Sequence, residues 1–141
     1  MDRVLLDTDT LSEVIKGKDL VVAERGRAYV QAHGRLTISA VTVMEAVQGF
    51  QRVQRATQLD RFVSRLAAFE ILPFETEVAI LAGRIYGDLK RTGQPIGRAD
   101  PMIAATAMSG GLAVVTGNVA HYARIAALGY HLAVEDWRAA Q

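Results

Sequence analysis

The sequence Val4-Leu5-Leu6-Asp7-Thr8-Asp9-Thr10-Leu11-Ser12-Glu13 decides the fold that we predict. Residues 3–6 form a short, mostly apolar run, which predicts a buried strand that stops at Asp7. Thr10 and Glu13 have the Ser/Thr-x-x-Glu spacing of a capping box, so we expect a helix to open there and to close at Gly17. The chain therefore begins with a strand, a loop and a helix, and a carboxylate stands where the strand ends.

The same alternation of short apolar runs and helical periodicity continues along the chain. Further strands are expected at residues 36–39, 70–74, 112–116 and 130–134. Further helices are expected at about 19–33, 42–53, 57–69, 75–91, 100–108 and 119–128. This order predicts an α/β fold: a three-layer α/β/α domain with a mainly parallel central sheet and helices on both faces.

The whole chain has the composition of one globular domain. It has 141 residues, of which 50% are hydrophobic, so we expect a single domain over residues 1–141. No apolar run is long enough to span a bilayer, and Met1-Asp2-Arg3 leads into a strand without a signal peptide, so we expect a cytoplasmic protein with no membrane partner. Cysteine is absent, which excludes disulfides and leaves oxygen or imidazole groups as metal ligands.

Four polar residues are expected to meet at one edge of this sheet. In open α/β folds, ligands bind where the carboxyl ends of the strands lie. The candidates stand at strand ends or in the first turns of helices: Asp7, Glu45, Asp100 and Asn118. Clustered carboxylates without a nearby cation repel one another, and their hard oxygen atoms suit Mg²⁺ or Mn²⁺. A bound cation of this kind supports phosphodiester hydrolysis.

Each acidic residue also has a simpler structural explanation. Asp100 precedes Pro101 and is a good N-cap, and Glu45 has the spacing of a capping box with Thr42. Asp9 or Thr10 is expected to cap the first helix; for Asp9 this is a simpler role than metal contact. Asp7 is harder to explain in this way, because a carboxylate directly after an apolar strand needs a partner that offsets its desolvation.

Four segments resemble the motifs of PIN-domain VapC toxins over nearly the whole chain. Residues 4–13 resemble the opening strand that delivers the first catalytic aspartate, and 38–45 are similar to the second motif, which carries the glutamate. The most specific match is Ile96-Gly97-Arg98-Ala99-Asp100-Pro101-Met102-Ile103-Ala104-Ala105, with its Ile-Gly, Asp and Ile-Ala-Ala pattern. Residues 114–122 correspond to the fourth motif.

The fourth motif departs from the family pattern. Position 118 is asparagine, and His121 stands where an acid often occurs, so the fourth carboxylate is absent and the number of bound metal ions stays open. The resemblance implies that Asp7, Glu45, Asp100 and Asn118 are catalytic and that Asp7 and Asp100 bind the metal. We expect support or RNA contact from Asp9, Thr116, Arg98 and His121, although a surface role is the simpler account of a lone histidine.

The resemblance also implies a function. It predicts the toxin of a type II toxin-antitoxin system: an endoribonuclease that uses Mg²⁺ or Mn²⁺, cleaves RNA such as tRNA or rRNA, is occluded by an antitoxin protein and forms a homodimer. Arg98 is the cation nearest to Asp100 in sequence. Other arginines recur on the predicted helices, where a solvating role is the simpler explanation: Arg52, Arg55, Arg61 and Arg65.

Two alternatives remain at this point. In the first, the domain has lost cleavage together with the fourth acid and is a module that binds RNA or a partner protein. Alternatively, Asp7 and Asp9 form the aspartate-x-aspartate motif of a haloacid-dehalogenase-type phosphohydrolase, with Asp7 as nucleophile and Asp9 as acid/base. That chemistry also requires a lysine after a later strand, and Lys16, Lys18 and Lys90 do not stand there.

Overall fold

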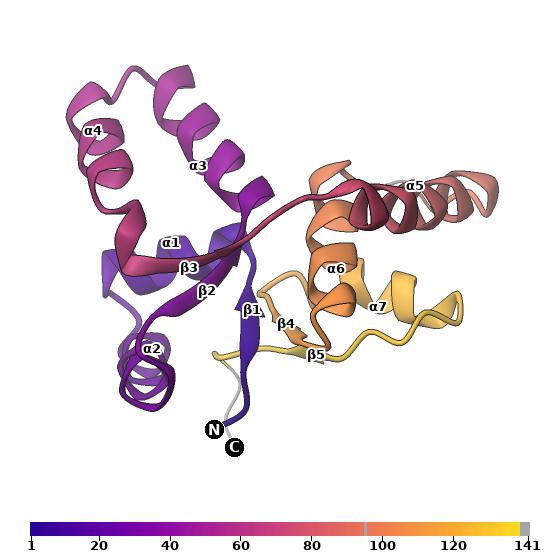
Figure 1. The fold of residues 1–141 in the computed structure, drawn as a ribbon, viewed down its shortest axis with the longest axis horizontal. Coiled ribbons are helices and arrows are strands. Elements are labelled where there is room, and N and C mark those ends of the chain that lie inside the picture. Colours follow the sequence, from indigo (N-terminus) through magenta and orange to yellow (C-terminus); the bar gives the residue numbers. More distant parts are fainter. Residues whose placement is uncertain (95, 139–141) are drawn as a thin grey trace.

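The computed structural model describes residues 1–94 and 96–138 (Figure 1). Its strands are β1 (Val4–Leu6), β2 (Leu36–Ser39), β3 (Phe69–Leu72), β4 (Ala113–Val115) and β5 (Val134–Glu135). Its helices are α1 (Thr8–Lys16), α2 (Leu20–His33), α3 (Ala40–Arg52), α4 (Ala56–Ser64), α5 (Thr76–Arg91), α6 (Ala99–Ser109) and α7 (Val119–Ala127). A short 3₁₀ turn, η1 (Leu66–Ala68), joins α4 to β3.

The described strands pair in parallel, as the βα alternation predicts. One ladder has the order β1-β4-β5, and a second joins β2 to β3. β1 and β2 lie next to each other, so the two ladders meet at β1. Figure 1 shows the consequence: α1 to α4 lie with β2 and β3 on one side of β1, and α5 to α7 lie with β4 and β5 on the other. These two sides are called the first and the second lobe.

Alternating side chains on the strands build two hydrophobic cores. Leu5 and Val114 pack in the core with apolar residues of α5, α6 and α7. Val4, Leu6 and Val115 face the opposite way and pack with α1, α2, α3 and α4. Successive strand residues point to opposite faces, so both faces of the β1–β4 pair are covered by helices. This confirms the predicted three-layer α/β fold.

Two predicted helix starts are wrong, for one physical reason. α1 begins at Thr8 with Asp7 as its N-cap, and the Asp7 carboxylate accepts a hydrogen bond of 3.0 Å from the Thr10 N–H. α3 begins at Ala40, and the Ser39 hydroxyl accepts from the Thr42 N–H. In both units the helix follows the strand at once, so the last strand residue or the one after it caps the helix. The two capping boxes do not form.

Three further predictions need correction. α6 begins at Ala99, so Asp100 lies in its first turn and is not the N-cap. The last strand is only β5, because the chain turns after Gly129: the Leu132 N–H bonds to the Tyr130 carbonyl, and the Tyr130 hydroxyl donates to Asp88 at 2.6 Å. Residues 130–133 are therefore outside the strand. The predicted helix 57–69 likewise ends in η1, and β3 begins at Phe69.

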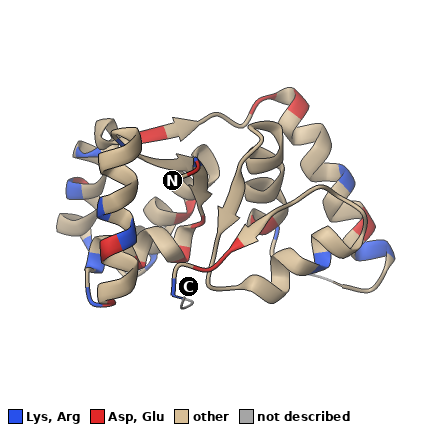
Figure 2. Ribbon diagram, turned by 90° about the horizontal axis from the view of Figure 1, so that it is seen from below, with Lys and Arg blue, Asp and Glu red and all other residues tan. Residues whose placement is uncertain are grey.

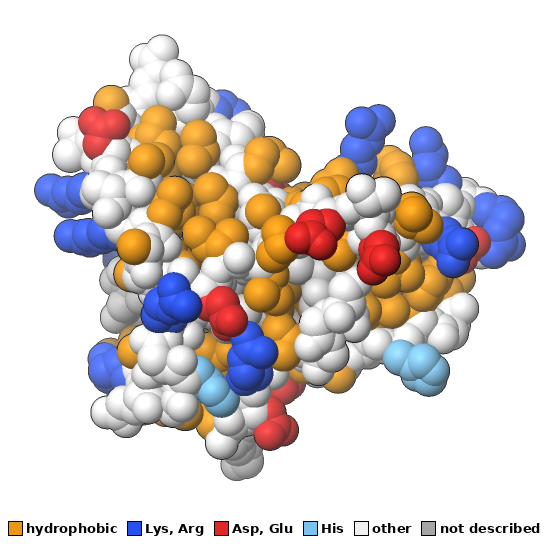
Figure 3. All heavy atoms as spheres, viewed as in Figure 1, with side chains coloured by type: hydrophobic (Ala, Val, Ile, Leu, Met, Phe, Trp, Pro, Cys, Tyr) orange, Lys and Arg blue, Asp and Glu red, His pale blue; other side chains and the backbone are white. Residues whose placement is uncertain are grey.

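The surface is mixed in character. Lys and Arg residues lie mainly on the helices at the two ends of the molecule, whereas acidic residues also occur on the segments between them (Figure 2). Hydrophobic side chains gather over the first lobe and in the hollow between the lobes (Figure 3). Within the described ranges, no helix has the length and apolarity needed to cross a membrane.

Candidate active site

The predicted site residues converge on one cavity. It has a volume of about 400 Å³ and opens where β1, β2 and β4 end. Its wall is formed by residues of α1, α3, α6 and the segment after β4: Asp7, Thr8, Asp9, Ser12, Glu13, Lys16, Glu45, Asp100, Ile103 and Asn118. The structure thus brings together Asp7, Glu45, Asp100 and Asn118 from four separate parts of the sequence.

Asp7 is the most buried of these carboxylates, with 4% of its surface exposed. Its N–H extends the β1–β4 ladder by donating to the Val115 carbonyl at 3.0 Å, and this bond fixes its backbone at the sheet edge. Burial, followed by the neighbouring Asp9, raises the pKa of Asp7 to about 8, while hydrogen bonds from Thr116 and Thr10 act in the opposite direction. Burial therefore makes the charged form of the Asp7 carboxyl group unfavourable.

Glu45 is held by hydroxyl groups. The Thr8 hydroxyl donates to the Glu45 carboxylate at 2.5 Å and lies 3.1 Å from the Thr42 hydroxyl. The Ser39 hydroxyl bonds to Thr42 in turn. The capping-box explanation of Glu45 is therefore wrong: its carboxylate is directed across to α1 and is available to the cavity.

Asp100 is bound by two residues of α7. Its Oδ2 lies 3.0 Å from His121 Nδ1, and the Tyr122 hydroxyl donates to its Oδ1 at 3.4 Å. Tyr122 is fully buried, and burial together with the Asp100 charge strongly raises the pKa of its hydroxyl, which stays protonated and able to donate. The N-cap explanation of Asp100 is thus replaced by a network that orients its carboxylate at the cavity.

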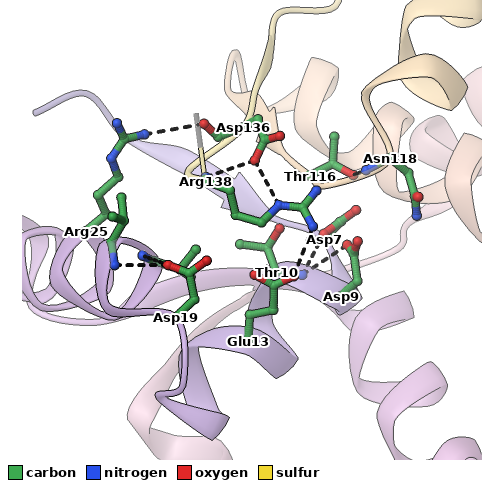
Figure 4. Close-up of polar contacts among 12 residues, drawn as sticks. Asp7, Asp9, Thr10, Glu13, Asp19, Arg25, Thr116, Asn118, Asp136 and Arg138 are labelled. Carbon is green, nitrogen blue, oxygen red and sulfur yellow. Dashed lines mark hydrogen bonds and ion pairs between the residues drawn. The ribbon is translucent and has the colours of Figure 1, made fainter. Parts of the chain in front are cut away.

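The segment after β4 completes the cavity wall. Thr116 is fully buried, and its hydroxyl accepts a hydrogen bond of 2.9 Å from the Asn118 N–H (Figure 4). Asp9 also lies in the wall, and its carboxylate accepts from the Thr10 N–H at 3.0 Å. The expectation that Asp9 or Thr10 caps α1 is wrong, because Asp7 is the N-cap. Arg98 is exposed before α6 and is not part of the wall.

The donor set fits a hard divalent cation in its chemistry. Carboxylate and amide oxygens line the cavity, and the unfavourable burial of Asp7 is the kind of electrostatic cost that a bound cation relieves. Among the residues that the structure describes, however, no three acidic or histidine side chains already converge as the ligands of one ion.

Sequence reasoning missed several residues at this site. Thr8, Thr42 and Tyr122 hold the carboxylates, and Lys16 lines the cavity. Thr8 stands between two aspartates at the start of α1, and this position could have indicated a role at the site. The predicted helix start at Thr10 placed Thr8 in a loop instead. The contact between Thr8 and Glu45 joins residues 37 positions apart and has no local pattern in the sequence.

Comparison with known proteins agrees with this architecture. The family model described as "PIN domain" matches residues 4–128. The chain is 36% identical to the tRNA(fMet)-specific endonuclease VapC of Salmonella typhimurium and 34% identical to that of Shigella flexneri; each match covers 97% of this chain and 99% of the relative. A crystal structure of DNA-bound VapBC from Salmonella typhimurium superposes with a TM-score of 0.76 at 35% identity, covering 97% of this chain and 99% of the other. The chain therefore belongs to the PIN-domain family, within its VapC group of toxin ribonucleases.

Proposed function

We propose that Asp7, Glu45 and Asp100 carry out divalent-metal-dependent hydrolysis of RNA phosphodiester bonds. The observation that supports this proposal is their convergence on one cavity from three different elements. Helix caps and surface solvation do not account for this arrangement, because Glu45 and Asp100 are bound by other side chains and cap no helix.

The residues have distinct roles in the proposed reaction. Asp7 and Asp100 would hold the metal, and Asn118 would bind it through its amide oxygen or orient a water molecule. When bound, Mg²⁺ or Mn²⁺ would lower the pKa of a water molecule and offset the negative charge of the phosphate. Glu45, held by Thr8, would accept a proton from the attacking water, and the water oxygen would bond to phosphorus as the bond to the ribose oxygen breaks. The released ribose oxygen would take up a proton from solvent and leave as a hydroxyl group.

RNA cleavage by single carboxylate variants tests this assignment. Labelled total RNA is incubated with the purified protein in Mg²⁺ or Mn²⁺, with and without a chelator. We expect cleavage by the wild type only with free metal, and a loss of about 100-fold or more for Asp7→Asn, Glu45→Gln and Asp100→Asn. Asp60→Asn is the matched control, because Asp60 is exposed on α4 and is not part of the cavity wall.

The same assay separates cleavage from simple binding. If wild type and carboxylate variants leave RNA equally intact but retain it in a gel shift, the chain is a binding module, as the missing fourth acid allows. If chelation leaves cleavage unchanged, the metal role is wrong while the nuclease assignment stands. The phosphohydrolase alternative loses its basis, because the matched family is the PIN domain.

We further propose that the protein is controlled by a cognate antitoxin. The solved relative from Salmonella is a VapBC assembly on DNA, and that from nontypeable Haemophilus influenzae, with a TM-score of 0.77 at 26% identity, is also a VapBC structure. This chain exposes several large apolar side chains, among them Met44 on α3 and Ile80 on α5. Co-expression with the product of an adjacent short reading frame, followed by affinity capture, tests this partnership.

The substrate and assembly are proposed from the same relationship. The Salmonella and Shigella relatives are described as specific for tRNA(fMet), so we propose tRNA as the first substrate to examine, with rRNA as the comparison. Cleavage of purified tRNA pools, with the ends mapped by sequencing, tests this choice. We also propose a homodimer, which light scattering after size-exclusion chromatography measures directly.

A further inference from the structure

A second hollow adjoins the acidic cavity. It has a volume of about 340 Å³ and is lined by Glu13, Lys16, Lys18, Asp19 and Arg138. Glu13 and Lys16 also line the acidic cavity, so the two hollows share a wall at the end of α1. The chain thus places basic side chains directly beside the carboxylates.

Arg138 lies at this boundary and makes two ion pairs. Its Nη1 donates to Glu13 at 3.3 Å and its Nε donates to Asp136 at 3.3 Å. The guanidinium also packs on the backbone of Gly117, where a Cβ atom would lie only 2.1 Å from Nη2. Figure 4 shows this side chain reaching over α1 toward the cavity that contains Asp7 and Asp9. The guanidinium therefore lies beside the segment that joins Thr116 to Asn118.

The acidic residues of this hollow are already engaged. The Asp19 carboxylate accepts the Val21 and Val22 N–H groups at the start of α2, and Glu13 is paired with Arg138. Lys16 and Lys18 are exposed, and no ion pair involving them occurs in the described ranges 1–94 and 96–138. Their ammonium groups are thus available to an anionic ligand.

An RNA strand needs such cations here. Its phosphates carry one negative charge each, and binding proteins gain most of their affinity by neutralising them with Lys and Arg. The carboxylates of the acidic cavity carry the same sign of charge as these phosphates and repel them. Neither hollow is lined by the arginines on or beside α3 and α4: Arg52, Arg55, Arg61 and Arg65.

We propose that Lys16, Lys18 and Arg138 form a binding groove for the RNA phosphate backbone next to the acidic cavity. This proposal rests on the proposed ribonuclease function and adds the path of the substrate to it. Arg138 contributes a guanidinium that lies against Gly117, and the two lysines contribute exposed ammonium groups. The groove holds the strand, while the carboxylates act on the adjoining phosphodiester.

Binding of a fluorescently labelled single-stranded RNA tests the groove. Anisotropy is measured at several salt concentrations in an Asp100→Asn background, which prevents cleavage. We expect Arg138→Gln to weaken binding by about threefold or more, and the triple change with Lys16→Gln and Lys18→Gln by about tenfold or more. Each lost cation lowers the slope of log affinity against log salt by about 0.7. Arg138→Lys keeps the charge and retains most of the slope.

Matched variants control for general effects of charge and folding. Arg27 has a comparable exposed pair with Glu24 on α2, and Lys90 lies on α5, so Arg27→Gln and Lys90→Gln should bind RNA like the background protein. Thermal unfolding verifies that every variant is folded. Unchanged affinity and slope in the folded triple variant would overturn the groove while the cleavage assay leaves the nuclease assignment intact. Failure of the wild type both to bind and to cleave RNA would overturn both proposals.

Discussion

The hydroxyl of Thr8 donates a hydrogen bond of 2.5 Å to the carboxylate of Glu45 and joins α1 to α3 across the cavity. Thr8 directly follows Asp7, so one β–α junction positions two of the proposed catalytic carboxylates. A hydrogen bond to a charged acceptor contributes more than one between neutral groups.

Thr8→Val removes this hydrogen bond while keeping the shape of the side chain. We expect kcat for RNA cleavage to fall by about tenfold with little change in KM, because Glu45 loses its orientation toward the attacking water while the groups that would bind RNA are unchanged. Thr8→Ser restores the hydroxyl and should recover most of the rate. Thr57→Val, at an exposed position on α4, is the control. Equal rates for Thr8→Val and wild type would rule out a positioning role.

Asp7 makes the metal-free protein less stable as the pH rises. Its pKa is raised from 3.8 to about 8 in the fold, so its stabilising contribution is complete below pH 4 and is lost as the pH rises to about 8. Asp7→Asn removes this titration and keeps an acceptor for the Thr10 N–H. At pH 8 with a chelator, we expect the free energy of unfolding of the variant to be higher than that of the wild type by about 1 kcal/mol or more.

Urea unfolding at pH 4 and pH 8 measures this difference. Asp60→Asn should show the pH dependence of the wild type, because Asp60 is exposed. If the difference in unfolding free energy between pH 4 and pH 8 is the same for the wild type and Asp7→Asn, the raised pKa of Asp7 is contradicted.

Divalent metal should offset the same electrostatic cost. We expect Mg²⁺ or Mn²⁺ to raise the Tm of the wild type in proportion to the logarithm of its concentration above Kd. Asp7→Asn and Asp100→Asn should show a much smaller rise, whereas Asp60→Asn should respond fully. Differential scanning fluorimetry provides the measurement, and an equal rise in all four proteins would indicate binding elsewhere.

His121 is expected to orient Asp100. The pair is partly open to solvent, with 42% of the His121 side chain exposed, so its contribution is screened. We expect His121→Ala to reduce cleavage by about threefold, a smaller loss than that of Asp100→Asn. His121→Asn, which retains a hydrogen-bonding group, should lose less. Single-turnover rates distinguish these values, and a loss as large as that of Asp100→Asn would place His121 among the reacting groups.

Gly117→Ala tests the position of Arg138 without changing any charge. The new Cβ displaces the guanidinium, which is the flexible end of its side chain, so the fold should adjust with little loss of stability. Surface ion pairs such as those with Glu13 and Asp136 contribute about 0–1 kcal/mol. We expect RNA affinity to fall by about threefold with an unchanged Tm. Gly49→Ala, where a Cβ meets open space, is the control.

The sequence predicted the strands more reliably than the ends of the helices. Apolar runs such as Val4–Leu6 and Leu36–Ser39 depend on burial, which local hydrophobicity reports directly. The capping boxes at Thr10 and Thr42 were wrong because a local spacing does not show that Asp7 and Ser39 already cap those helices.

The sequence predicted which residues meet at the site but not the tertiary contacts around them. The convergence of Asp7, Glu45, Asp100 and Asn118 followed from parallel strand order and from the family motifs. The pairing of Arg138 with Glu13 joins residues 125 positions apart, and Gly117 accommodates it only through the absence of a side chain. Such a contact depends on the tertiary path of the chain, which no periodicity encodes.

β1 contributes alternate side chains to both hydrophobic cores and delivers Asp7 at its end. Glu45 belongs to a helix that packs mainly in one core, and Asp100 belongs to a helix of the other. An ion bound by these carboxylates would link the two lobes. A substitution that disturbs the packing of either core, even far from the carboxylates, would then lower kcat while the protein is still folded.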